Sequence, residues 1–149
     1  MNILTIISLI CLLLYIELGI YVLAKSPKTN INRAFFSLSL CLAIWSFAFV
    51  FIYEAQCPEK AYQWYKLSAV GWGLAPAFMI KFLSHLTNYP KKNLNKNILF
   101  YTLILLSLYI IILVFTKNWI INEFKTHEDF WHLSFNYPSI YFSFYMFFI

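Results

Sequence analysis

The sequence predicts an all-α, polytopic membrane bundle with four complete helical spans and a truncated fifth. The chain has 149 residues, of which 62% are hydrophobic and only 11% are charged, whereas about 25% of the residues of a soluble domain are charged. Mean hydropathy is +0.69, and the apolar residues form long runs without strand-type alternation. Because each helical crossing needs about 20 residues, we expect residues 1–149 to form one transmembrane region with no soluble output domain.

The first two spans have the most uniform apolar sequence. We expect the first over residues 3–24, where Glu17 is the one charged residue, and the second over 34–53, which holds no charge. Ser39 and Ala43 in the second span form a small-xxx-small pair, which lets two helices approach closely in lipid.

The link between these spans is short and basic. It contains a proline, which stops a helix, and the asparagines Asn30 and Asn32. Asparagine is a favoured N-cap residue, so we expect these side chains to cap the helix that follows.

The third span, over residues 62–86, is the least uniform. It carries Lys81 and His85, two polar side chains that are rare within a span. An aromatic collar opens this span, and such collars mark the level of the lipid headgroups. The collar residues are Tyr62, Trp64 and Tyr65.

Small residues and one proline shape the middle of the third span. Ser68, Gly71 and Ala75 share one helical face, so this face is expected to pack against a neighbouring helix. Pro76 removes a backbone donor and should kink the helix near mid-depth. Pro76 and the face of Ser68, Gly71 and Ala75 are therefore the places where two alternative helix packings are expected if any exist, and static packing is the favoured alternative.

The C-terminal third of the chain is less regular. A fourth span is expected over residues 98–116, a mixed loop over 117–137, and an incomplete fifth span over 138–149, as in the front portion of a longer protein. The loop holds His127 and His132, but their spacing of five residues does not fit the helical His-x-x-x-His metal signature. No metal site is predicted.

The distribution of lysine and arginine predicts that the N-terminus lies outside the cell. Cytoplasmic links carry an excess of these residues. The first and third links hold six of them and no acid, whereas the second and fourth hold four, with five of the six acidic residues. We therefore expect the basic residues behind the net charge of +5 to set the membrane topology and to contact anionic lipid. The net charge does not point to nucleic acid, because no basic stretch exceeds two residues.

Few polar or charged side chains within the spans are candidates for a functional role. Glu17 and Lys81 lie at matching depths, about 8–11 Å from the same surface by helical rise, so they are candidates for an ion pair, with snorkelling of the lysine as the alternative. His85 lacks a second histidine at its depth for haem ligation. The three cysteines form no Cys-x-x-Cys pair. No catalytic residue and no cofactor is predicted, and the ligand-binding residues stay open.

Several short motifs resemble the N-terminal seven-helix (7TM) membrane region of bacterial histidine kinases, which also precedes some GGDEF diguanylate cyclases. The resemblance covers roughly residues 18–90. The motifs are Asn30-Ile31-Asn32-Arg33-Ala34-Phe35-Phe36, Trp45-Ser46-Phe47, the run 61–64, Lys66-Leu67-Ser68-Ala69-Val70-Gly71-Trp72-Gly73, Pro76, Phe82 and Leu86-Thr87.

The resemblance implies seven helices, an external N-terminus and a plasma-membrane sensor that passes its signal to a cytoplasmic output domain. It further implies that the partners are the lipid bilayer, the later helices, the output domain and a second copy of the chain. A fragment of a small-solute transporter and a membrane anchor or scaffold without a ligand are the alternative functions. Transporters tend to show paired broken helices and repeated halves, whereas here only Pro76 interrupts a span.

Overall fold

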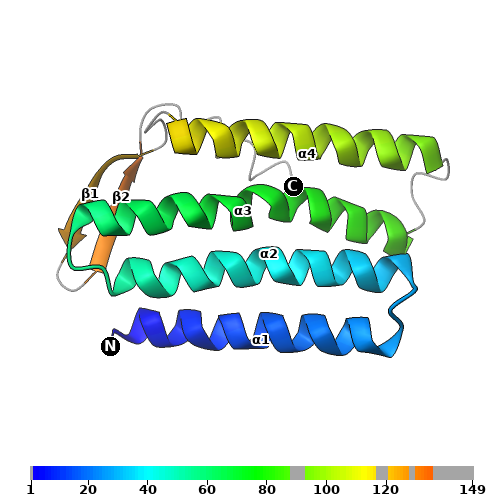
Figure 1. Cartoon of the computed structure of the whole chain (residues 1–149), viewed down its shortest axis with the longest axis horizontal. Coiled ribbons are helices and arrows are strands. Elements are labelled where there is room, and N and C mark those ends of the chain that lie inside the picture. The colour runs from blue at the N-terminus through cyan, green and yellow to red at the C-terminus, as the bar shows by residue number, and fades with distance from the viewer. Residues whose placement is uncertain (1, 88–92, 117–120, 128–129, 136–149) are drawn as a thin grey trace.

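Four antiparallel helices lie side by side in chain order, as a single row (Figure 1). The computed structural model describes residues 2–87, 93–116, 121–127 and 130–135, with side chains for 2–87 and 97–116. The helices are α1 (Ile3–Lys25), α2 (Asn30–Tyr53), α3 (Pro58–Thr87) and α4 (Asn93–Thr116). The predicted helical membrane bundle is thereby confirmed for the first four spans, while residues 138–149 lie outside the described part.

The helix surfaces match a lipid environment. All four helices are long and apolar enough to cross a membrane. The outer helices α1 and α4 expose many large apolar side chains, with Ile3 at 70% and Leu105 at 67% of their surface. An apolar surface of this extent would be an aggregation hazard in water, but in a bilayer it faces the lipid tails.

A two-stranded hairpin lies in the segment that was expected to be a loop. Strands β1 (Ile121–His127) and β2 (Phe130–Phe135) pair antiparallel, with Lys125 opposite His132. The two strands are rich in β-branched and aromatic residues, which fit a pleated strand well. Residues 117–137 are therefore not loop throughout.

Asn32 caps the helix before it, which corrects the prediction that it caps the helix after it. Helix α2 begins at Asn30, and its N-cap residue Thr29 makes no side-chain capping hydrogen bond. The Asn32 amide instead donates to the carbonyl oxygens of Val22, at 2.9 Å, and Ser26, at 3.2 Å. Carbonyls in the last turn of α1 have no partner within their own helix, so the side chain of α2 supplies one.

Each of the three glycines lies at one contact between neighbouring helices. A Cβ atom placed on Gly19 would lie 3.0 Å from Cβ of Ser39, where α1 meets α2. One placed on Gly71 would lie 2.6 Å from backbone atoms of α2, and one on Gly73 would lie 3.0 Å from Cγ1 of Ile111 in α4. The expected packing at Gly71 is present, and the predicted pair Ser39 and Ala43 is buried.

Two aromatic residues at the start of α3 pack against neighbouring helices, while their predicted level at the lipid headgroups stays a prediction. Tyr65 is only 4% exposed and belongs to a core cluster with Ile52, Trp72 and other residues of α2, α3 and α4. The Trp64 ring stacks on the Phe51 ring of α2 with centroids 4.2 Å apart. Burying these rings between helices gains dispersion contacts that lipid would not match.

Candidate functional site

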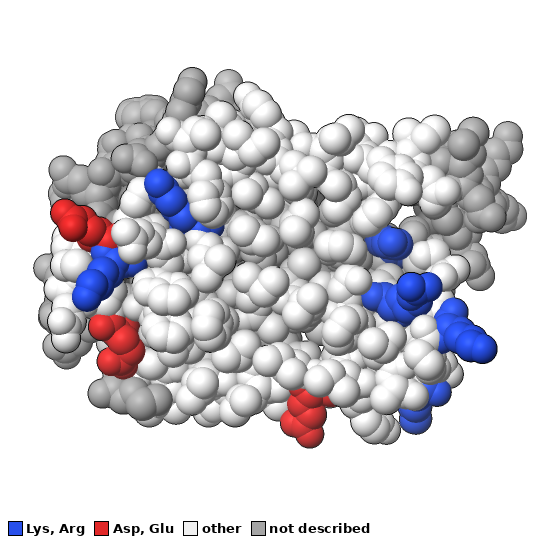
Figure 2. All heavy atoms as spheres, in the orientation of Figure 1, with Lys and Arg blue, Asp and Glu red and all other residues white. Residues whose placement is uncertain are grey.

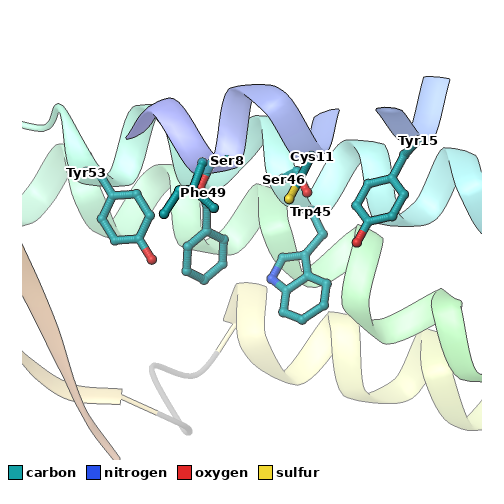
Figure 3. Close-up of a pocket in the computed structure, with 8 residues that line it drawn as sticks. Ser8, Cys11, Tyr15, Trp45, Ser46, Phe49 and Tyr53 are labelled. Carbon is teal, nitrogen blue, oxygen red and sulfur yellow. The ribbon is translucent and has the colours of Figure 1, made fainter. Parts of the chain in front are cut away.

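A groove of about 240 Å³ runs between α1 and α2. Most of its lining is apolar, with hydroxyl, thiol and indole groups among the rings. Its walls are formed by Ile7, Ser8, Cys11 and Tyr15 of α1 and by Trp45, Ser46, Phe49 and Tyr53 of α2 (Figure 3). A site of this kind can bind a small apolar or amphipathic molecule, and it offers no arrangement for covalent chemistry.

The aromatic rings of the groove share one orientation. Those of Tyr15, Trp45, Phe49 and Tyr53 point to the same side of the helix pair (Figure 3). The sequence did not predict these residues as the lining of a groove because they sit within continuous apolar runs, although Trp45 belongs to one of the motifs that carry the resemblance. One signal was present: the lining residues of both helices follow the same helical spacing of i, i+1, i+4 and i+8.

Trp45 connects the groove to the next helix contact. Its backbone nitrogen and its Cβ lie 2.6 and 2.9 Å from the position of a Cβ on Gly71. Its ring also packs, with that of Phe49, against the core cluster that contains Trp72. Any shift of the Trp45 side chain in the groove would therefore change the contact between α2 and α3.

The structure does not bring Glu17 and Lys81 together. Glu17 is exposed on α1, at one edge of the row. The Lys81 ammonium lies over the Phe100 ring of α4, 4.2 Å from its centroid. Because α2 separates α1 from α3 in the row, the matching depth of the two charges does not make them neighbours.

Lys81 and His85 instead share a second, polar pocket of about 280 Å³. This pocket lies where α2 begins, α3 ends and α4 begins. Both residues are half-buried, and Asn30 and Asn97 contribute amide groups to the lining.

Pro76 is buried inside α3, and the helix continues through it from Pro58 to Thr87. Ser68, on the same helix, is fully buried, and its hydroxyl donates to the Tyr65 carbonyl at 2.7 Å. The role of Pro76 and Gly71 as a place of alternative packing stays a prediction, as does the kink.

Apart from Glu17, which is exposed within α1, the described charges divide between the two ends of the bundle (Figure 2). At the end where α1 passes into α2 they are all basic. At the opposite end, acidic and basic side chains occur together. The basic end holds Lys25, Lys28, Arg33 and Lys81, and the mixed end holds Glu54, Glu59, Lys60 and Lys66.

Comparison with known protein families decides the identity. The family model for the N-terminal 7TM region of histidine kinase matches residues 4–149, nearly the entire chain. The chain belongs to this family. No curated protein and no solved structure matches it.

The 7TM region is a membrane-embedded sensor region of a signal-transduction protein, so the function predicted from the resemblance is confirmed. A sensor region binds a ligand or responds to another stimulus, and it is not itself a catalytic domain. Among the described side chains, no three His, Cys, Asp or Glu residues are grouped so that they could hold a metal ion.

Proposed function

We propose that this 7TM region is the input region of a bacterial sensor kinase in the plasma membrane, with its N-terminus outside the cell. The match over residues 4–149 carries the proposal. Its proposed partners are the later helices, a cytoplasmic histidine kinase domain and a second copy of the chain. A diguanylate cyclase is the alternative output domain.

The charge distribution supports the proposed orientation. Every charged side chain that the structure describes around the α1–α2 link is basic, including Lys25, Lys28 and Arg33. An excess of lysine and arginine marks cytoplasmic links. The groove lies nearer the other end of α1 and α2, which this orientation places in the outer half of the bilayer.

We propose the groove between α1 and α2 as the part that receives the signal, and a small amphipathic molecule dissolved in the bilayer as the ligand. The mixed lining of rings and hydroxyl groups favours such a molecule. A ligand shifts an equilibrium only if it binds one helix arrangement better than another. Trp45 supplies that coupling, because its side chain lines the groove while its backbone contacts the Gly71 position of α3.

Autophosphorylation of the parent protein in lipid vesicles tests the proposal. Ser46→Leu fills the groove and should change the rate of autophosphorylation from ATP several-fold. The control Leu13→Phe adds volume at an exposed, lipid-facing position of α1 and should leave the rate within twofold of the wild type. A parent protein without phosphotransfer activity would reject the kinase assignment, and equal effects of the two variants would reject the groove.

A further inference from the structure

We infer that the polar pocket at the basic end of the bundle binds a phosphate group, supplied either by an anionic phospholipid or by phosphate in solution. Residues of three helices line one space of about 280 Å³ there. The Lys81 ammonium and the amides of Asn30 and Asn97 are among the donor groups of its lining, and the Phe100 ring also lines it. Such a set of donors suits the oxygens of a phosphate.

No acidic side chain is among the described residues that line the pocket around Lys81. The sequence holds no acidic residue between Glu59 and Glu123 or between Glu17 and Glu54. Within the described residues, the contact made by the Lys81 ammonium is with the Phe100 ring. A ring attracts a cation but leaves its net charge in place, and an uncompensated charge within a span is costly.

The depth of Lys81 favours a lipid as the source. It lies six residues before Thr87, the last residue of α3, which is about 9 Å by helical rise. A lysine stem can carry its ammonium toward the interface over such a distance. Basic pockets between transmembrane helices are known to hold acidic headgroups. The pocket lies near the end of α3 in either orientation, so this inference does not rest on the proposed function.

Native mass spectrometry of the full chain in mild detergent tests the inference. The wild type should retain phosphatidylglycerol over phosphatidylcholine, whose phosphate is neutralised by choline. Lys81→Met should weaken this retention roughly tenfold, the value of one lost charged hydrogen bond. The matched control is Lys66→Met, because Lys66 also lies on α3 over an aromatic ring, that of Tyr62 at 4.6 Å, but at the opposite end.

A second pair of variants keeps the test decisive if Lys81→Met fails to fold. Asn97→Asp places a carboxylate at the exposed rim of the pocket and should abolish the preference for phosphatidylglycerol. Gln63→Glu adds the same charge at an exposed amide of the other end and should not. Displacement by excess inorganic phosphate identifies a soluble source, and its failure identifies the lipid. Equal retention of both lipids by the wild type together with no retention of inorganic phosphate, or equal losses within either pair, overturns the inference.

Discussion

Gly71 of α3 lies directly against the backbone of Trp45 in α2. The Trp45 nitrogen is 2.6 Å from the position that a Cβ on Gly71 would occupy, closer than a Cβ can approach another atom. The two helices therefore touch through their backbones at this point. Close approach of this kind is how small residues stabilise helix pairs in lipid, where no hydrophobic effect drives association.

Gly71→Ala should destabilise the bundle by about 1–3 kcal/mol, the usual cost of overpacking, because the new methyl group meets backbone atoms that cannot move aside. The control Gly73→Ala places its methyl group against the flexible Ile111 side chain and should cost clearly less. Denaturant unfolding in micelles, followed by tryptophan fluorescence, measures both. A Gly71→Ala variant as stable as Gly73→Ala would contradict the described contact.

Asn32→Asp should loosen the connection between α1 and α2. The carboxylate has the shape of the amide but no N–H to donate to the carbonyls of Val22 and Ser26. Loss of such bonds costs about 1 kcal/mol, and repulsion between the carboxylate and the carbonyls adds to it. Denaturant unfolding in micelles measures the free energy of unfolding of Asn32→Asp. The control is Gln63→Glu, which makes the same change from amide to carboxylate at an exposed position. If both variants match the wild type, the capping role is wrong.

Thr5→Val should weaken the other end of the same helix pair. Thr5 is only 1% exposed, and its hydroxyl donates to the Glu54 carboxylate at 2.9 Å. Valine keeps the volume of the side chain but removes the donor, so we expect a loss of about 1 kcal/mol. Glu54→Gln retains an acceptor oxygen and should cost less, whereas a double-mutant cycle of Thr5→Val with Glu54→Ala, which removes the acceptor, reports the coupling of the two side chains. Strictly additive effects would show that the bond contributes nothing.

Cys57 should react with a membrane-impermeant thiol reagent applied to intact cells, because the proposed orientation places the α2–α3 link outside. Cys57 is half-buried, whereas Cys41 is buried within α2. A Thr29→Cys variant in a Cys57→Ser background moves the thiol to the α1–α2 link and should be labelled only after permeabilisation. The reverse labelling pattern would invert the orientation.

The helical spans were predictable from the sequence because their cause is local. A run of about 20 apolar residues must satisfy its backbone hydrogen bonds internally within a bilayer, and only a helix does so within one segment. The predicted close contact at Gly71 also follows from the spacing of small residues, since residues three and four apart share a face. The hairpin of β1 and β2 was missed because its residues are mixed polar and apolar and lie outside any span.

What the sequence by itself determined about this protein is therefore its membrane character, the approximate limits of four helices and the faces on which they are able to pack. Only the tertiary structure decided which side chains meet. Because the helices lie in a single row, Lys81 contacts Phe100 and not Glu17. The Asn32 side chain binds carbonyls at the end of α1, and residues of α1 and α2 together line one groove. These pairings depend on how each helix is rotated and which neighbour it has, and both are set by contacts between residues far apart in the chain.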